Sequence, residues 1–553
     1  MTTSLVNVLP RRRVSAAGKS LTRLCLPCFR RFISYKHTTP CFVTTPIFYV
    51  NAGPHIGHLY TVLLADAHAR WNRLTGRKVV FSTGTDEHGL KIQQAAARSQ
   101  RSPPEYCDEV SQQFKVLFES ANIQHDDFIR TTQDRHHRAV QRFWEHLESN
   151  GHIYRGSYEG WYSVSDEAFL TSEEVKDVAT HDGSSAKVSV ESEQPVTWMK
   201  ENNYMFRLSA FTHRLERWLD TGAVKPSKFE TVIRQYLQDL PDLSVSRQRE
   251  RLPWGVPVPG DESQTIYVWL DALINYLTVA GYPDNLTTWP PTSQIIGKDI
   301  LKFHAVYWPA FLMAADLPPL TRLLCHSHWL VEGRKMSKSL GNVVDPSDCM
   351  ERYSVDGLRY FLLKEGTPHS DGNYTDRKVM ETINSGLVNT LGNLLHRCTS
   401  SSINGAQVFP PLNPQALDTC FSAEELHTYH TLKTLPDSLD EHYQNLTIYK
   451  ALDELISVLH QTNAMFDHHK PWQLTKQPDQ LEHLNTVLHV AMETLRTCGI
   501  LMQPVIPNMA DQLLTKLGIR ADRRTVDCIY EDFVKDEPVN LGTDTSVLLK
   551  RVK

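Results

Sequence analysis

The sequence predicts an α/β domain built on a parallel sheet, which an insertion splits into two halves, followed by an α-helical bundle. The first observation is that strand-like and helix-like segments alternate in two separate stretches, residues 42–97 and 294–331, as is typical of a parallel sheet. The second is that a mixed, polar region, residues 134–263, separates these stretches. The third is that long helical patterns punctuated by prolines begin at about residue 376.

The two halves of the sheet domain show similar patterns. The first is expected to contain a strand at residues 42–50, a helix at 59–74 closed by Gly76, a strand at 79–82, a turn at 83–89 and a helix at 91–97. The second is expected to contain a short strand at 294–296, a helix at 303–315 and a strand at 323–331 that runs into a loop rich in Gly, Lys and Ser. In the bundle, the helical patterns at 380–396, 447–466 and 484–501 are the longest.

Composition narrows the class of protein. Hydrophobic residues make up 41% of the 553 residues and charged residues 22%, which is typical of a globular protein, and no apolar run approaches the roughly 18–20 residues that span a bilayer. The net charge of -5 excludes a global basic field, so any nucleic acid must bind through local patches. The ten cysteines have no regular spacing, which favours a reducing compartment.

The N-terminus differs from this average. The first acidic residue is Asp66, and the segment before it is rich in Arg, Lys, Ser and Thr. This profile predicts an organelle transit peptide over residues 1–39, because arginines interrupt any apolar core of the kind that a secretory signal needs. A basic arm that contacts RNA is the alternative. Cys25 and Cys28 have no second pair of ligands nearby and are not expected to bind zinc.

Two motifs carry phosphate chemistry. His55-Ile56-Gly57-His58 lies between a strand and a helix, where free N–H groups and two imidazoles suit phosphate and Gly57 allows close approach of a base. Lys335-Met336-Ser337-Lys338-Ser339 follows a later strand, and its lysines and hydroxyls suit the β- and γ-phosphates of ATP. HxGH alone is a weak signal, but the two motifs in this order reinforce each other.

Together these motifs resemble the HIGH and KMSKS sequences of class I aminoacyl-tRNA synthetases. The resemblance implies a Rossmann-type catalytic domain, split by a connective insertion, that activates an amino acid with ATP and Mg²⁺ and transfers it to tRNA. Four further segments are similar to methionyl-tRNA synthetases: 46–51, 84–89, 267–272, and 297–300 with 303–304. The implied substrates are L-methionine, ATP and tRNA(Met). The acid-free N-terminus predicts an enzyme of the mitochondrial type that is located in the mitochondrial matrix.

The resemblance also implies roles for individual residues. His55, His58, Lys335 and Lys338 would be catalytic, and the ATP site would add Gly57, Gly297 and Asp299. Asp86 would bind the substrate ammonium, and the thioether would be enclosed by Ile47, Tyr49, Trp269, Ala272, Tyr276, Ile300 and His304. A buried carboxylate and an aromatic and aliphatic sleeve are what methionine requires, with the Tyr49 hydroxyl as a weak donor to sulfur. Asn393 and Arg397, four apart on one helix face, and Trp472 would read the anticodon.

The sequence departs from the family pattern at two places. Ala272 is followed by Leu273 where many relatives have proline, which affects only the pocket wall. No cysteine lies between Cys107 and Cys325, whereas many relatives carry zinc-binding cysteines in the insertion. We therefore predict that the protein binds no zinc and that Trp161, Tyr162 and Phe169 pack in place of a metal.

The expected domains follow from these patterns: transit peptide 1–39, first catalytic half 40–133, insertion 134–263, second catalytic half 264–340, stem-contact linker 341–375, anticodon-binding bundle 376–520 and tail 521–553. Because the chain ends soon after the bundle, a monomer is expected.

Three alternatives remain open. A leucine, valine or cysteine enzyme of the same class is disfavoured by the short insertion and by the lack of zinc-type cysteines. A small-molecule nucleotidyltransferase also uses HxGH but does not need the helical bundle. A non-catalytic, tRNA-binding scaffold is disfavoured by the two intact motifs.

Overall fold

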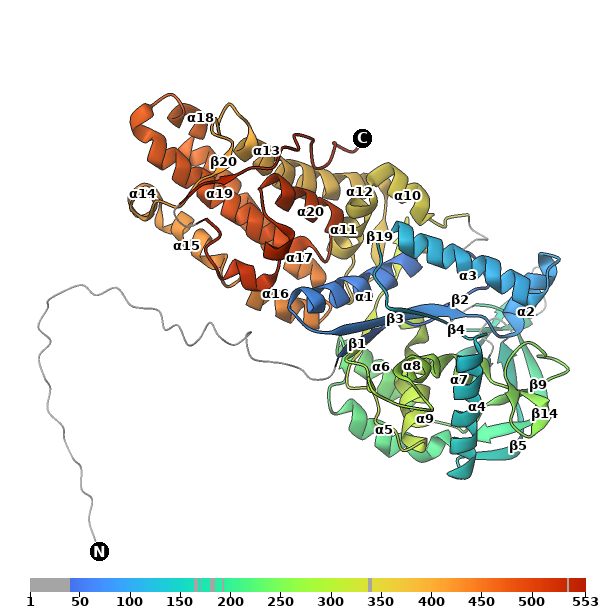
Figure 1. The fold of residues 1–553 in the computed structure, drawn as a ribbon. Helices are drawn as coiled ribbons and strands as arrows, with labels where there is room; N and C mark the ends of the chain where they lie inside the picture. Colours follow the sequence, from blue (N-terminus) through green and yellow to red (C-terminus); the bar gives the residue numbers. More distant parts are fainter. Residues whose placement is uncertain are drawn as a thin grey trace, which may run out of the picture. The chain divides into compact units, whose positions relative to one another are not determined.

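The computed structural model describes residues 40–163, 168–170, 172–179, 185–190, 193–336, 341–534 and 537–553 (Figure 1). The predicted transit peptide and Lys338 lie outside the described residues, and so does the side chain of Lys335. No helix in the described part of the chain is long and apolar enough to cross a membrane.

A seven-stranded parallel sheet forms the centre of the α/β part, which confirms the predicted Rossmann-type fold. Its order is β10 (Val224–Lys225), β16 (Leu323–His326), β15 (Ser293–Gly297), β1 (Cys41–Thr44), β3 (Val79–Asp86) and β2 (Phe48–Tyr49), with β4 (Asp127–Arg130) also paired to β3. The two halves of the chain meet where β1 pairs with β15. In open parallel sheets, ligands bind at such a switch point, beyond the carboxyl ends of the strands.

Two predicted strands are each broken in the structure. Instead of one strand at 42–50, β1 ends at Thr44 and β2 begins at Phe48, because Pro46 between them has no N–H to donate to a ladder. The strand predicted at 323–331 is wrong in the same way: β16 stays in the main sheet, whereas β17 (Trp329–Val331) pairs with β18 (Arg334–Lys335) and β19 (Gly372–Tyr374). At both breaks the chain leaves the strand at the carboxyl edge of the sheet.

The helices predicted at 59–74, 91–97 and 303–315 are present as α1 (Ile56–Leu74), α2 (Leu90–Arg98) and α9 (Trp308–Ala314), with earlier starts in the first half. Three further helices, which the sequence analysis did not predict, are α3 (Pro103–Ser120), α7 (Val268–Leu273) and α8 (Asn275–Ala280). The helix predicted at 303–315 begins with a π-helical turn, η5 (Phe303–Tyr307), in which the Trp308 N–H bonds to the carbonyl of Phe303. Pro309 follows this wide turn and donates no backbone hydrogen bond.

The insertion shares a core with the second half of the sheet domain. Its strands are β5 (Ile153–Ser163), β6 (Ala168–Leu170), β7 (Val175–Ala179), β8 (Ser185–Ser189), β9 (Val196–Phe206), β11 (Leu243–Ser244), β12 (Ser246–Gln248), β13 (Pro257–Val258) and β14 (Asp261–Ile266), and its helices are α4 (Asp134–Ser149), α5 (Thr212–Leu219) and α6 (Lys228–Tyr236). Phe143 and Phe206 from the insertion pack in one buried cluster with Trp308 and Phe311 of α9. The insertion is therefore anchored beside the strand ends, and it supplies β10 to the sheet.

The C-terminal part is helical, as predicted. It contains α12 (Asp376–Ile383), the π-helix η7 (Asn384–Gly392), α13 (Asn393–Thr399), α14 (Pro414–Cys420), α15 (Ala423–Thr431), α16 (Leu435–Gln444), α17 (Ile448–His469), α18 (Pro471–Leu474), α19 (Leu481–Met502) and α20 (Pro507–Lys516), after α10 (Pro346–Tyr353) and α11 (Val355–Glu365). From Thr486 onward α19 is buried on all sides, which makes it the central helix of this part (Figure 1).

Helix α1 ties the sheet to the helical part. A buried ion pair of 2.7 Å joins Asp66 on α1 to Arg359 on α11, and Arg359 also donates to the carbonyl of Val505. Trp71 stacks on Tyr443 of α16 at 4.3 Å between ring centroids. The N-terminus of the same helix carries the first phosphate motif, so the motif lies on a helix that is anchored to the helical part.

Candidate active site

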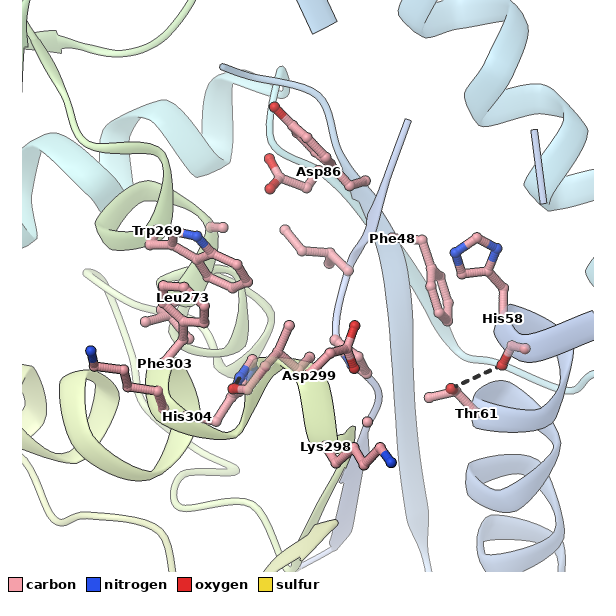
Figure 2. A pocket seen from close by; sticks show the side chains of 18 of the residues that line it. Phe48, His58, Thr61, Asp86, Trp269, Leu273, Lys298, Asp299, Phe303 and His304 are labelled. Atoms are coloured by element: carbon pink, nitrogen blue, oxygen red, sulfur yellow. Dashed lines mark hydrogen bonds between the residues drawn. The ribbon is translucent and has the colours of Figure 1, made fainter. Parts of the chain in front are cut away.

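A cavity of about 520 Å³ lies beyond the carboxyl ends of β1, β3, β15 and β16. In Figure 2, Trp269 and His304 lie on one side of it, His58 and Thr61 of α1 on the other, and Asp86 at one end. Thirteen residues expected in the methionine and ATP sites line this single space: Ile47, Tyr49, His55, Gly57, His58, Asp86, Trp269, Ala272, Tyr276, Gly297, Asp299, Ile300 and His304. Residues from positions 47 to 304 thus meet at the switch point of the sheet.

An apolar sleeve forms one end of the cavity. Trp269 stacks on Phe303 at 3.6 Å between ring centroids, with 9° between the planes. Ile47 and Ala272 add aliphatic surface. Asp86, at the end of β3, is only 8% exposed and lies at this end. A carboxylate beside an apolar sleeve suits a small ligand that carries both an ammonium and an apolar side chain.

Tyr276 and His304 form a fixed pair in the wall of the sleeve. The Nδ1 atom of His304 lies 3.0 Å from the carbonyl of Ile300 and its Nε2 atom lies 2.8 Å from the Tyr276 hydroxyl. Because a carbonyl only accepts, Nδ1 carries the proton and Tyr276 donates to Nε2. Burial lowers the pKa of His304 to about 4, so the ring is neutral at physiological pH. His304 therefore adds no positive charge to the sleeve.

The turn after β3 is anchored by a buried network. Asp271 on α7 accepts from His88 at 2.6 Å and from His136 at 2.9 Å. Although burial acts to raise the pKa of Asp271, the two histidines hold it below its usual value. Glu87 is bonded by Arg130 at 2.7 and 3.0 Å. These contacts fix the two residues that directly follow Asp86 and hence its position.

The two histidines of the first motif are oriented by backbone hydrogen bonds to their Nδ1 atoms. The Gly57 N–H donates to Nδ1 of His55 at 3.0 Å, and the His55 N–H donates to Nδ1 of His58 at 3.1 Å. In each neutral ring the proton is therefore on Nε2, which is a donor. Burial, with His55 as a second cause, lowers the pKa of His58 well below its usual value. The pair thus offers neutral N–H donors beside the N-terminus of α1.

The structure explains why two of the predicted site positions are glycines. A Cβ on Gly57 would lie 2.9 Å from the His55 ring, and a Cβ on Gly297 would lie 2.6 Å from Oδ1 of Asp299. A side chain at either position would displace a neighbour that lines the cavity. His328 lies 3.1 Å from Asp299 through its Nε2 atom, which links β15 to the segment after β16.

Sequence reasoning missed several lining residues. His326, at the end of β16, lies 2.9 Å from the Thr61 hydroxyl; no signal marked it, because the strand was predicted to continue to residue 331. Phe169, Leu170 and Glu174 reach the cavity from the insertion, and Glu174 pairs with Lys302. Their sequence carries no signal either, because only the folded insertion brings them to the sheet.

Of the three aromatic residues expected to pack in place of a metal, Tyr162 and Phe169 contact each other, whereas Trp161 packs on Trp198. Tyr162 and Phe169 lie 5.0 Å apart and Trp161 and Trp198 5.2 Å apart, between ring centroids. The buried Arg247 guanidinium lies over both Tyr162 and Phe169, at 5.6 and 5.2 Å. This cluster holds β6, which carries Phe169 and Leu170 into the cavity wall.

The second phosphate motif begins at the cavity. Lys335 pairs through its backbone with Leu330, and Met336 lines the cavity. The motif therefore leaves the β17–β18 hairpin at the side where His55 and His58 lie.

The residues expected to read the anticodon lie together on the helical part. The Arg397 guanidinium lies 5.8 Å from the ring centroid of Trp472 and also pairs with Asp467. Asn393 is exposed one turn earlier on α13, and Trp472 is 41% exposed. We name Asn393, Arg397 and Trp472 the anticodon surface, after the role that the sequence analysis predicts for them.

Comparison with known proteins gives consistent matches over most of the chain. Residues 41–399 match the family of class I tRNA synthetases (M), and residues 417–533 match the anticodon binding domain of methionyl tRNA ligase. The chain is 53% identical over 511 residues to the mitochondrial methionine–tRNA ligase of Homo sapiens, covering 88% of this chain and 86% of that protein. It is 50% identical over 539 residues to the mitochondrial enzyme of Bos taurus, covering 92% and 90%.

A solved structure of the same family has a similar fold. The Mycobacterium tuberculosis methionyl-tRNA synthetase in complex with methionyl-adenylate superposes with a TM-score of 0.86 at 37% identity, covering 92% of this chain and 99% of that one.

Proposed function

The chain belongs to the methionyl-tRNA synthetases of class I, as its motifs indicated, and from this premise we propose how its own residues perform the reaction. The family's activity is the ligation of methionine to tRNA at the expense of ATP. One observation carries the proposal: a single cavity brings the buried Asp86, an aromatic sleeve and two neutral histidine donors together at the sheet's switch point.

At the methionine end, Asp86 binds the substrate ammonium. Ile47, Tyr49, Trp269, Ala272, Tyr276, Ile300 and His304 enclose the thioether side chain. The polarisable sulfur favours aromatic neighbours, and the rigid Trp269–Phe303 stack offers such a surface without reorganisation. The substrate carboxylate is left facing the ATP site.

At the ATP end, Gly297 and Asp299 contact the adenosine and Gly57 allows its close approach. The substrate carboxylate attacks the α-phosphate in line, which forms the carboxylate–phosphorus bond of methionyl-adenylate and breaks the bond to the departing diphosphate. The Nε2–H groups of His55 and His58 donate to the phosphate oxygens as charge develops. Lys335 and Lys338 hold the β- and γ-phosphates, and Mg²⁺ enters with ATP as part of the substrate.

In the second step, the terminal ribose hydroxyl of tRNA attacks the adenylate carbonyl and AMP leaves. The anticodon surface selects tRNA(Met): Trp472 stacks on an unpaired base, and Asn393 and Arg397 bond to its polar edge. The exposure of Trp472 and its proximity to Arg397 support this assignment.

We further propose that the protein acts in the mitochondrial matrix as a monomer. The acid-free N-terminus and the mitochondrial names of its relatives support this location. A reporter fused to residues 1–45 should enter the matrix, and a reporter that stays in the cytosol would contradict the mitochondrial location. Sedimentation should give the mass of one chain.

ATP–pyrophosphate exchange measured with each of the twenty amino acids tests the proposal. We expect methionine to give the fastest exchange. Exchange led by leucine would refute the assigned sleeve, and exchange with no amino acid would favour a non-catalytic, tRNA-binding protein.

A further inference from the structure

Four titratable side chains converge in the helical part, far along the chain from the residues that line the cavity. Glu425 lies on α15, His468 and His469 end α17, and His483 lies on α19. Oε1 of Glu425 is 2.9 Å from Nδ1 of His468 and 3.5 Å from Nε2 of His469. In the described part of the chain, these three residues form the one group of His, Cys, Asp or Glu side chains that could hold a metal ion.

His469 is the unusual member of this cluster. Its side chain is only 3% exposed, and its Nε2 atom has no hydrogen-bond partner among the described residues, although it points toward Glu425. A buried polar atom without a hydrogen bond is costly. Its other ring nitrogen, Nδ1, lies 2.8 Å from Nε2 of His483. The fold thus orients a buried imidazole whose inward nitrogen is not used by a hydrogen bond.

We propose that Glu425, His468 and His469 bind a divalent transition-metal ion such as Zn²⁺, with water completing a tetrahedral site. Imidazole and carboxylate are ligands that suit this class of ion. The three ligand atoms lie within 4.8 Å of one another, so movements on the order of 1 Å would bring them to bonding distances of about 2.0–2.2 Å. His468 is 66% exposed on its side chain, which gives an ion access from solvent.

Two neighbours orient the ligands as outer partners do in metal sites. Binding through Nε2 requires a proton on Nδ1 of His469, and His483 is placed to accept it. The second carboxylate oxygen of Glu425, Oε2, accepts the Ser422 N–H at 2.7 Å, which turns Oε1 toward the histidines. The site departs from the expectation of no zinc, because that expectation rested on missing cysteines and this site uses none.

The position of the ion connects it with tRNA recognition. His469 is followed by Lys470, whose φ of 48° ends α17, and then by Pro471 and Trp472. A metal ion that joins α15 to the end of α17 would hold the turn that presents Trp472. The site would therefore stabilise the anticodon surface without contacting ATP or methionine.

Titration of the chelator-treated full chain with Co²⁺, and separately with Zn²⁺ in competition, tests the proposal. The chain has 25 His and 10 Cys, so matched variants are needed to separate this site from background binding. We expect one Co²⁺ per chain with the intense visible absorption of a tetrahedral site. Glu425→Gln and His469→Gln should weaken binding at least about tenfold, and His483→Phe about tenfold.

Variants at histidines outside the cluster serve as controls for background metal binding. His427→Gln and His460→Gln change exposed histidines on α15 and α17 and should bind Co²⁺ as the unmodified chain does. Glu425→Gln keeps the capping interaction with Ser422, because Gln also serves at this position of a helix, so the variant should fold. Equal Co²⁺ affinity in the unmodified chain, Glu425→Gln and His469→Gln, or no tetrahedral absorption in the unmodified chain, would overturn the site.

Discussion

The cavity and the anticodon surface hold their functional side chains in opposite ways. In the cavity, Asp86 is 8% exposed and the neighbouring polar groups are fixed by hydrogen bonds within the protein. On the anticodon surface, Trp472 is 41% exposed, and Arg397 is paired with Asp467, which is itself 63% exposed on its side chain. A small ligand that must react needs desolvated, preorganised partners, whereas an unpaired base needs a solvent-exposed aromatic ring on which it can stack.

This difference predicts that the two regions can be impaired independently. Changes in the cavity should slow both adenylate formation and aminoacylation of tRNA, because the second step uses the product of the first. Changes on the anticodon surface should slow only aminoacylation.

Replacement of Asp86 should have the largest effect. Asp86→Asn keeps the shape of the side chain but removes the charge that pairs with the ammonium, and kcat/KM for methionine in pyrophosphate exchange should fall on the order of a thousandfold. Asp418→Asn, at an exposed position of α14, is the matched control. Exchange by Asp86→Asn within a fewfold of the unmodified chain would mean that another group binds the ammonium.

Lys338→Ala should slow adenylate formation by ~10²–10³, the scale for losing one donor that acts in the transition state. The effect should appear in kcat of pyrophosphate exchange more than in KM for methionine. Lys550→Ala, at an exposed position near the C-terminus, is the control. Near-normal exchange by Lys338→Ala would remove this lysine from the catalytic set.

Trp472→Ala should lower kcat/KM for tRNA by roughly 10–100-fold, because base stacking on an aromatic ring contributes about 1–3 kcal/mol. Pyrophosphate exchange should be unchanged. Leu481→Ala, another exposed apolar residue of the helical part, should change neither rate. Normal charging of tRNA by Trp472→Ala would show that stacking occurs elsewhere.

Tyr276→Phe should raise KM for methionine up to about tenfold, because it removes the donor to the buried Nε2 of His304 and leaves that atom unpaired. The value of kcat should change less. Because the ring is kept, a larger loss of folded protein would point to a structural role instead; thermal unfolding distinguishes the two.

Acid should destabilise the cavity through His304, whose pKa of about 4 lies below the value of about 6.5 in an unfolded chain. The unfolded chain binds the proton first, so the stability that this histidine contributes is present above pH 6.5 and is lost as pH falls toward 4. At pH 5.5 the loss should be about 1 kcal/mol. Urea unfolding of His304→Gln should depend less on pH; an unchanged pH dependence would contradict the assigned protonation state.

Local patterns in the sequence predicted much of the fold. The helices at 447–466 and 484–501 were found, as α17 and α19, because they bury apolar residues at helical spacing. The strands at 42–50 and 323–331 were drawn too long, because an apolar run does not reveal which backbone groups pair. Nor did the sequence indicate that the insertion shares a core with α9, since that contact joins segments more than 100 residues apart.

The same distinction between local patterns and long-range contacts applies to the candidate site. Residues within motifs, such as His55 and Asp86, could be found because their spacing is local. Contacts such as Lys302 with Glu174, or His326 with Thr61, depend on elements that meet only in the folded chain. The position of the proton on Nε2 of His55 and His58 likewise follows from the cap of α1 and not from the motif alone.

The most direct test measures pyrophosphate exchange and tRNA aminoacylation side by side on Asp86→Asn and Trp472→Ala. We predict that Asp86→Asn loses both rates and that Trp472→Ala loses only aminoacylation. Loss of exchange in a folded Trp472→Ala, or exchange retained by Asp86→Asn, would contradict the assignment of activation to the cavity and of tRNA recognition to the anticodon surface.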